Sequence, residues 1–175
     1  DGRRVLFDPF PAYVNLPVRR VRADVVSVSH QHSDHNYLDK VDGKPLVADA
    51  EGSHDPMPGI RLTGVSASHD EQGGSLRGSI LCMTLQAEGL KITHLGDLGM
   101  VPDEALRHKL FMPDILLVPV GGTYTLDARA ARQTVDALQP RIVIPMHYRT
   151  EHGGLKELST LAPFLEAMAP ARASA

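Results

Sequence analysis

The sequence contains no tryptophan, a single cysteine and few aromatic residues, which make up 5% of the chain. The cysteine, Cys82, cannot form a disulfide within the chain. It lies in the apolar run Ser79–Gln86, where a buried and unreactive thiol is the ordinary outcome. These features are typical of a reducing compartment, so we expect the protein in the cytoplasm.

An excess of positive charge is also absent. The chain has 18 Lys and Arg against 21 Asp and Glu, which gives a formal net charge of -3. Binding to a phosphate backbone needs a basic stripe, so nucleic acid is not expected as a partner. No apolar run is long enough to cross a bilayer, and no charged and then apolar leader precedes the first expected strand. We expect a soluble protein that acts on a small molecule without binding a membrane, and a homo-oligomer stays open.

The 175 residues, 42% of them apolar, suffice for one packed core, and no repeat or long linker divides them. We expect a single domain over residues 1–175, with Pro56–Gly59 and Gly121–Gly122 as internal loops. Short apolar or β-branched runs predict strands at Arg4–Phe7, Asp24–Ser29, Pro45–Ala48, Ile60–Ser66, Ser79–Gln86, Leu90–Leu95, Asp114–Val118 and Arg141–Ile144. Helical periodicity predicts helices at Pro102–Leu110, Leu126–Leu138 and Leu155–Met168. This order of elements indicates a mixed α/β fold.

Nine histidines are the unusual part of the composition, and four potential metal ligands fall within six residues. The expected strand Asp24–Ser29 runs straight into His30, which is followed by His32, Asp34 and His35. An extended segment points His30 and His32 the same way, and a turn brings Asp34 and His35 back towards them. Because zinc accepts imidazole and carboxylate ligands, this cluster predicts a metal site.

Three more candidate ligands each follow an expected strand. They are His69 after Ile60–Ser66, Asp97 after Leu90–Leu95 and His147 after Arg141–Ile144. Taken singly, His69 could be a strand-end polar residue, Asp97 a turn residue and His147 a core histidine. If one edge of the fold carries all these strand ends, the clusters meet there.

The pattern HxHxDH at His30–His35, with these three residues, resembles the signature of the metallo-β-lactamase superfamily over roughly Arg4–Met168. The resemblance is closest to its small bacterial metal-dependent hydrolases and to the ascorbate-6-phosphate lactonase branch. It rests on the stretches Val5–Pro9, His69–Gly74, Arg77–Gly78, His94–Gly99, Val118–Thr125 and Ile144–Tyr148. The resemblance implies an αββα sandwich, here without the first N-terminal strand of the family.

The resemblance also implies a site for two divalent metal ions, with zinc preferred and manganese or iron open. The first ion would be held by His30, His32 and His69, the second by Asp34, His35 and His147, and Asp97 would be shared. A hydroxide between the ions would hydrolyse an ester, lactone, thioester or phosphodiester, with Asp34 as the catalytic proton acceptor. Only 34 positions separate His35 from His69, fewer than in true β-lactamases, which disfavours antibiotic hydrolysis.

Other functions stay open at this point. A di-iron redox protein can share the fold, but that branch usually has Glu where this chain has His32. A non-catalytic metal-binding domain is a further alternative, although closed structural zinc sites favour cysteine. Nuclease activity is disfavoured because the chain has no basic surface pattern.

Residues around the signature have competing interpretations. Asp8 and Asp70 stand beside strand ends, where either could accept a hydrogen bond from a metal-bound histidine, although Asp8 could equally be a turn residue. Arg77 and Tyr124 could orient substrate or be structural, and His152 could reach the mouth of the site.

The remaining histidines and one loop complete the candidates. We expect His94 to pack or to bond to backbone, and His54 and His108 to lie on the surface. The loop Gly121–Thr125 either faces an anionic substrate group or simply connects a strand to a helix, with Thr125 as the N-cap.

Overall fold

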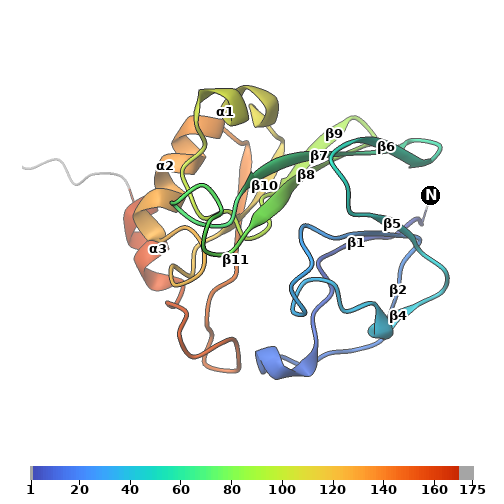
Figure 1. The fold of residues 1–175 in the computed structure, drawn as a ribbon, viewed down its shortest axis with the longest axis horizontal. Coiled ribbons are helices and arrows are strands. Elements are labelled where there is room, and N and C mark those ends of the chain that lie inside the picture. Colours follow the sequence, from blue (N-terminus) through green and yellow to red (C-terminus); the bar gives the residue numbers. More distant parts are fainter. Residues whose placement is uncertain (1, 170–175) are drawn as a thin grey trace, which may run out of the picture.

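Two β-sheets form the centre of the computed structural model, which describes residues 2–169 (Figure 1). The larger sheet has six strands in the order β11-β10-β9-β8-β7-β6, and the smaller has three in the order β1-β3-β5. A separate two-stranded ladder pairs β2 with β4. The mixed α/β prediction is confirmed. The single domain stays a prediction, and its residues 1 and 170–175 lie outside the described residues.

The elements have the following bounds. The strands of the larger sheet are β6 (Gly52–Met57), β7 (Ile60–Ser68), β8 (Ser79–Ala87), β9 (Leu90–His94), β10 (Ile115–Pro119) and β11 (Ile142–Met146). The others are β1 (Val5–Phe7), β2 (Val21–Arg22), β3 (Val25–Ser27), β4 (Val41–Asp42) and β5 (Leu46–Ala48). The α-helices are α1 (Glu104–Leu110), α2 (Ala128–Leu138) and α3 (Ala162–Met168), and 3-10 turns span Ala12–Val14 and Leu38–Lys40.

The direction of the strands decides which loops can meet. Strands β6 to β9 are antiparallel neighbours, whereas β9, β10 and β11 are parallel. Two-residue turns join β6 to β7 and β8 to β9, and a loop over residues 69–78 joins β7 to β8. The parallel neighbours need a crossover, which α1 and α2 supply. Since β7 and β9 run the same way, the carboxyl ends of β7, β9, β10 and β11 lie at one edge of the sheet.

The larger sheet is covered on both faces. The helices pack on one face and the smaller sheet on the other (Figure 1). In β8, Ile80 and Cys82 are buried in the core on the helix side, while Met83 and Leu85 are buried against the smaller sheet. A strand buried on both faces carries a continuous apolar run, which is why the sequence predicts this strand clearly.

Two helix predictions need correction. Thr125 is not the N-cap of α2, because the Asp127 carboxylate accepts the hydrogen bond from the Ala130 amide at 2.8 Å. The helix predicted from Leu155 begins only at Ala162. The preceding backbone is held by the neighbouring loop, since the Ser159 amide donates to the Gly121 carbonyl at 2.9 Å.

The strand predictions also missed part of the sheets. Strand β6 continues through Pro56, where the sequence predicts a loop. Proline is tolerated there because β6 is the edge strand and its ladder is irregular between His54 and Met57. The two-residue strands β2 and β4 are too short to leave a periodic signal. No helix among residues 2–169 has the length and apolar character needed to cross a membrane.

Truncating a core leucine tests this packing. Leu116 in β10 is fully buried in the core on the helix side, so Leu116→Ala should lower the free energy of unfolding by about 2–5 kcal/mol. Urea denaturation followed by circular dichroism measures the change. The control is Leu165→Ala on α3, a side chain that is 56% exposed, which should shift stability by less than about 1 kcal/mol. Equal losses in both variants would contradict the packing described.

Candidate metal centre

Four chain segments that follow strand ends converge at one edge of the fold. The segment from Ser29 to His35 follows β3 of the smaller sheet, and His69 is the first residue after β7. Asp97 lies shortly after β9, and His147 directly follows β11. The expected meeting of the four clusters is therefore found.

The Asp97 carboxylate is the centre of this arrangement. Its Oδ2 lies 3.3 Å from His35 Nε2, 3.4 Å from His147 Nε2 and 3.5 Å from His69 Nε2. His30 Nε2 is a little farther away, at 4.0 Å. The carboxylate is buried, so these ring nitrogens surround it with little solvent between them.

The predicted ligands fall into two groups whose nitrogen or oxygen atoms lie within 4.8 Å of one another. The groups are His30 with His32 and His69, and His35 with Asp97 and His147. A third group of this kind joins His30 and His35 to Asp8, which is not a predicted ligand. Within the first, His30 Nε2 and His32 Nδ1 are 3.0 Å apart. Asp34 belongs to neither group, and its Oδ2 lies 3.8 Å from His35 Nε2.

These separations between ligand atoms fit a tetrahedrally coordinated cation. Ligand atoms bound to zinc at about 2.0–2.1 Å in tetrahedral geometry are ~3.3 Å from one another. Moreover, Asp97 Oδ1, His69 Nδ1 and His147 Nδ1 are buried without a hydrogen-bond partner among the described residues. A buried carboxylate oxygen without a partner is costly, and a bound cation would remove that cost.

Asp8 holds the segment from Ser29 to His35 in place. Its carboxylate accepts hydrogen bonds from the Ser29 amide at 2.7 Å, the Ser29 hydroxyl at 2.5 Å and His35 Nδ1 at 2.9 Å. The Ser29 hydroxyl oxygen also lies 2.9 Å from His30 Nδ1. Asp8 therefore fixes the orientation of the His35 ring, as predicted for a residue that supports a ligand.

Asp70 does not have the predicted role. Its carboxylate accepts four backbone hydrogen bonds from the loop that follows it, donated by Gln72, Gly74, Leu76 and Arg77. With these bonds it shapes the loop and contacts no candidate histidine through a hydrogen bond. The prediction for Asp70 is wrong because its own loop folds back onto it.

The backbone is strained at two positions in the site. Asp8 has φ of 41° and His147 has φ of 54°, both in the left-handed region that side chains other than glycine rarely adopt. The loop before α2 also approaches closely, since a Cβ added at Gly121 would lie 2.0 Å from the His147 carbonyl oxygen. Such strain persists where the surrounding structure enforces it and is common at functional sites.

Burial and neighbouring charges shift the pKa values in the cluster. Burial lowers the pKa of His35, but hydrogen bonds to Asp8 and Asp97 outweigh it and raise the pKa to about 10. Burial, with the charge of His35, lowers the pKa of His30 to about 4. Burial raises the pKa of Asp97, but its bond to His35 and the charge of His147 hold that pKa well below its usual range. The site thus keeps the ionised carboxylate of Asp97 beside the imidazolium of His35.

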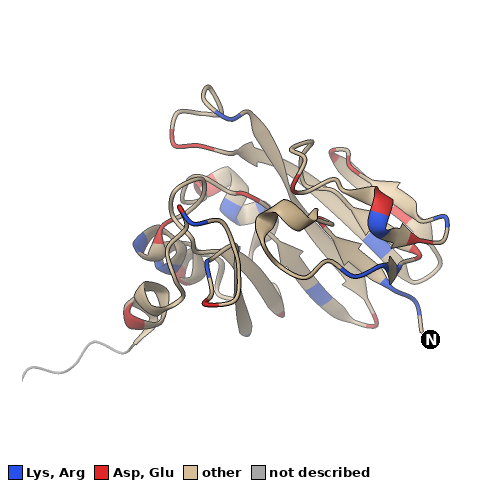
Figure 2. Cartoon of the chain, turned by 90° about the horizontal axis from the view of Figure 1, so that it is seen from below, with Lys and Arg blue, Asp and Glu red and all other residues tan. Residues whose placement is uncertain are grey.

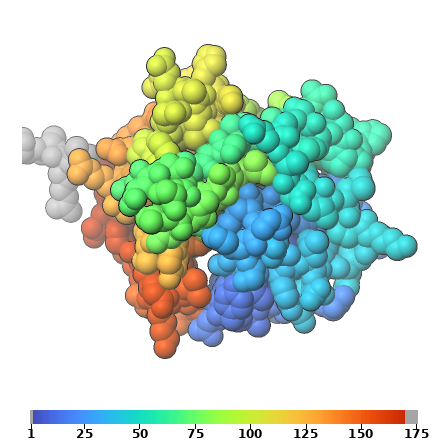
Figure 3. Space-filling view, viewed as in Figure 1, coloured from blue at the N-terminus to red at the C-terminus, as the bar shows by residue number. Residues whose placement is uncertain are grey.

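Two hollows reach this cluster from different sides and share no lining residue. The apolar pocket, of about 260 Å³, is bounded by Asp34, His35 and His147 at its base and by residues 7–16 and 154–158. The polar pocket, of about 350 Å³, is bounded by His69 and by Arg77, whose guanidinium lies 5.5 Å from the centre of the Tyr124 ring. Figure 3 shows the surface between the N-terminal and C-terminal segments that border the apolar pocket.

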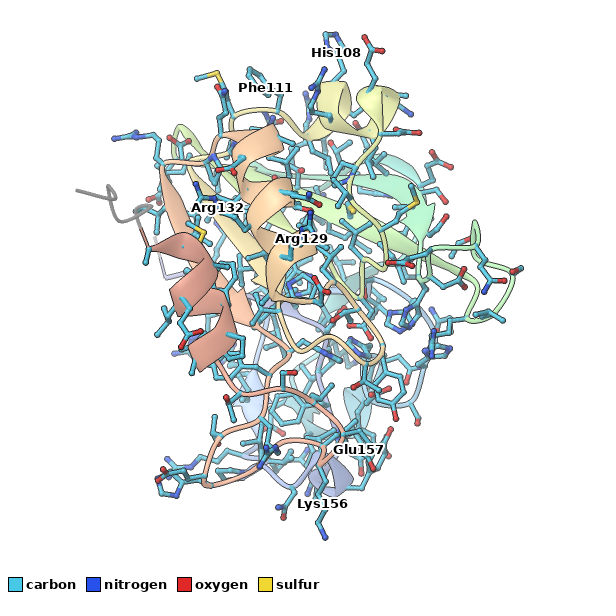
Figure 4. All side chains as sticks on the ribbon, turned by 90° about the vertical axis from the view of Figure 1, so that its left-hand side faces the viewer. His108, Phe111, Arg129, Arg132, Lys156 and Glu157 are labelled. Atoms are coloured by element: carbon cyan, nitrogen blue, oxygen red, sulfur yellow. The ribbon has the colours of Figure 1, made fainter. Side chains whose placement is uncertain are left out.

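Other histidines lie outside the cluster. His94 stacks on Phe7 with ring centroids 5.1 Å apart and accepts a hydrogen bond from the Gly96 amide, which confirms its predicted packing role. His108 is exposed on α1, as predicted (Figure 4). His54 Nε2 donates to a backbone carbonyl near the surface. His152 is exposed and lines neither of the two hollows at the cluster.

Sequence reasoning missed Ser29 and the apolar pocket. Ser29 carried a signal, because it immediately precedes the histidine cluster, but a hydroxyl beside a strand end is common. Phe10, Val14 and Leu16 lie in an irregular segment with no periodicity, and Leu155 falls in a predicted helix. Only their spatial meeting defines the pocket.

Comparison with known families agrees with this geometry. The sequence model of the family described as "Beta-lactamase superfamily domain" matches residues 1–147. The chain belongs to this superfamily and has its metallo-β-lactamase fold, which confirms the resemblance seen in the motifs.

The chain is similar to several metal-dependent hydrolases within this superfamily. The chain is 30% identical over 179 residues to a UPF0173 metal-dependent hydrolase from Thermococcus onnurineus, covering 85% of this chain and 79% of that protein. A similar hydrolase from Thermoplasma acidophilum is 33% identical over 175 residues, covering 85% of this chain and 77% of that one. A structure from Thermotoga maritima, assigned as a Zn-dependent hydrolase of the superfamily, has a TM-score of 0.77 and 36% identity. It covers 95% of this chain and 77% of its own.

Proposed function

We propose that the chain is a metal-dependent hydrolase with two divalent ions that cleaves an ester, lactone, thioester or phosphodiester. The observation that carries this proposal is the position of Asp97 Oδ2, within 3.5 Å of ring nitrogens from His35, His69 and His147. One carboxylate at the junction of two ligand groups is the arrangement that two neighbouring ions need. The names of the relatives, metal-dependent hydrolases, support the same activity.

The proposed ligand sets follow the two groups. The first ion takes His30, His32 and His69, the second takes His35 and His147, and Asp97 serves both. Asp34, which lies outside the two groups, is added to the second set because its Oδ2 lies 3.8 Å from His35 Nε2. When bound, such ions lower the pKa of water towards neutrality and polarise the carbonyl or phosphoryl oxygen under attack. No nucleophile from the protein is then required.

The remaining chemistry falls to side chains of the chain. Asp34 is the proposed proton acceptor, because it borders the apolar pocket and its carboxylate accepts no hydrogen bond within residues 2–169. Asp8 positions His35 through its hydrogen bond to Nδ1. Arg77, stacked on Tyr124 in the polar pocket and without a carboxylate partner among the described residues, would orient a polar or anionic part of the substrate.

The substrate is proposed to be a small molecule. Lys and Arg positions are interspersed with Asp and Glu positions along the chain drawn in Figure 2, and the net charge of -3 gives no basic excess that would attract a nucleic acid. Zinc is the preferred ion because His32 adds an imidazole to the first group, and a colourless metal-loaded protein would agree with zinc or manganese. A visible absorption band would instead favour the di-iron redox alternative. A cytoplasmic location stays a proposal that rests on the single cysteine.

A substrate screen with metal content measured in parallel tests the function. Protein stripped with a chelator should be inactive on a panel of p-nitrophenyl esters, lactones, thioesters and bis(p-nitrophenyl) phosphate. Two equivalents of zinc should restore hydrolysis of at least one class. A fully loaded protein that turns over no class would favour the non-catalytic alternative, and activity unchanged by stripping would refute metal dependence.

A further inference from the structure

The apolar pocket beside the metal centre is built from two segments far apart in the sequence. Phe7, Phe10, Val14 and Leu16 come from the N-terminal part, and Leu155 and Leu158 come from the segment before α3. At its base lie Asp34, His35 and His147, which belong to the proposed catalytic centre. A group in this pocket would therefore lie directly beside the reacting atoms.

The walls of the pocket are held together by the backbone. The Gly154 amide donates to the Val14 carbonyl at 3.1 Å. At Gly153 an added Cβ would lie 1.8 Å from the Asn15 carbonyl oxygen, so only glycine permits this approach. Contacts of this kind fix the distance between the walls before any ligand arrives, which favours a pocket that is largely preformed.

The charged residues of the same segment turn away from the pocket. Lys156 and Glu157, between the two leucines, are exposed and point into solvent (Figure 4). Among the described residues, the polar side chains that line the pocket belong to the centre or adjoin it, namely Asp8, Asp34, His35, His94, Asp97, His147 and Tyr148. Binding there must come mainly from removing apolar surface from water.

We propose that the pocket binds a hydrophobic acyl group of the substrate, next to the bond that is cleaved. The inference rests on the proposed function for the identity of the reacting centre. At about 260 Å³ the pocket is smaller than the roughly 300–1,000 Å³ typical of whole ligands, so it takes one part of the substrate. The polar pocket at His69 would hold the rest of the substrate, so the two pockets together fix the orientation of the substrate at the centre.

Calorimetric titration of the zinc-loaded protein with acetate, butyrate and hexanoate tests the pocket without relying on turnover. Affinity should rise about fourfold for each methylene that enters the pocket. The p-nitrophenyl esters of the same acids should show a parallel rise in kcat/KM. Affinity and kcat/KM that are both independent of chain length would overturn the inference.

Substitutions in the pocket wall test whether the dependence on acyl chain length arises in this pocket. Leu155→Ser and Phe10→Ser place a hydroxyl in the pocket wall and should flatten the dependence on chain length while acetate binding stays within about twofold. Leu165→Ser, at an exposed position of α3, is the matched control and should keep the dependence. A dependence unchanged in both pocket variants would place the acyl group elsewhere and refute the inference.

The two proposals fail in different ways. If hexanoate binds more tightly than acetate but no ester, lactone, thioester or phosphodiester is hydrolysed, the pocket stands and the proposed function falls. If metal-dependent hydrolysis occurs but neither the affinity nor kcat/KM rises with acyl chain length, the function stands and the pocket inference falls.

Discussion

Replacing Asp97 with alanine is expected to reduce the bound divalent metal from the proposed two ions per chain to less than one, and to abolish hydrolysis. The reason is that Asp97 Oδ2 lies within 3.5 Å of the Nε2 atoms of His35, His69 and His147. Without it, both ligand groups lose their shared anionic ligand, and the remaining imidazoles offset little of the charge of two cations. Elemental analysis after gel filtration gives the metal content, and the best substrate of the panel gives the activity.

The control is a carboxylate of the same type on the surface. Asp136→Ala removes an exposed i,i+4 pair with Arg132, which is worth at most about 0.5 kcal/mol. That variant should keep both metal equivalents and full activity. Circular dichroism should show that both variants are folded. Retention of two metal equivalents by Asp97→Ala would refute the shared-carboxylate site.

Replacing Asp8 with asparagine should weaken metal binding or activity by about 10–100-fold while leaving the fold intact. The Asp8 carboxylate accepts hydrogen bonds from His35 Nδ1 and from the amide and hydroxyl of Ser29. The amide of asparagine has one acceptor oxygen, so one of these donors would face an NH2 group. Asparagine tolerates the left-handed backbone at this position, where φ is 41°, so strain is not added. Competition with a zinc-binding dye measures the affinity.

A carboxylate immediately before β3 provides the comparison. Asp24→Asn changes a side chain that accepts a hydrogen bond from the Arg4 amide, outside the metal cluster. It should leave zinc affinity within about twofold of the original chain. If Asp8→Asn binds zinc as tightly as Asp24→Asn does, Asp8 does not position the ligands.

The convergence at the centre was predictable because strand ends are readable in the sequence. His69 and His147 directly follow β7 and β11, whose apolar residues predict strands. Parallel strands of one sheet end at one edge, so residues that follow them meet. His30 follows β3 of the other sheet, so its approach to Asp97 depends on how the two sheets pack together, which strand prediction does not show.

Predictions failed where a local preference competed with longer-range contacts. The periodicity from Leu155 onward predicts a helix, yet the Ser159 amide pairs with the Gly121 carbonyl instead. Asp70 was expected to support a histidine, but its loop offers four amides that are closer in the chain. No sequence pattern shows which of two available partners a polar group takes.

The sequence by itself showed a single cysteine, no basic excess and no long apolar run, and the order of its apolar runs indicated a mixed α/β fold. The HxHxDH pattern and the three later candidate ligands indicated a metal site by their chemistry and the family by resemblance. Residue type and short-range spacing are local properties of the chain, so the sequence shows them directly. The tertiary structure alone decided that Asp97 Oδ2 stands between the histidines, that Asp8 rather than Asp70 supports them, and that an apolar pocket opens beside His147. Those features depend on distances between segments up to about 150 residues apart in sequence, as Phe7 and Leu158 are in the apolar pocket, and only the packing of the fold sets these distances.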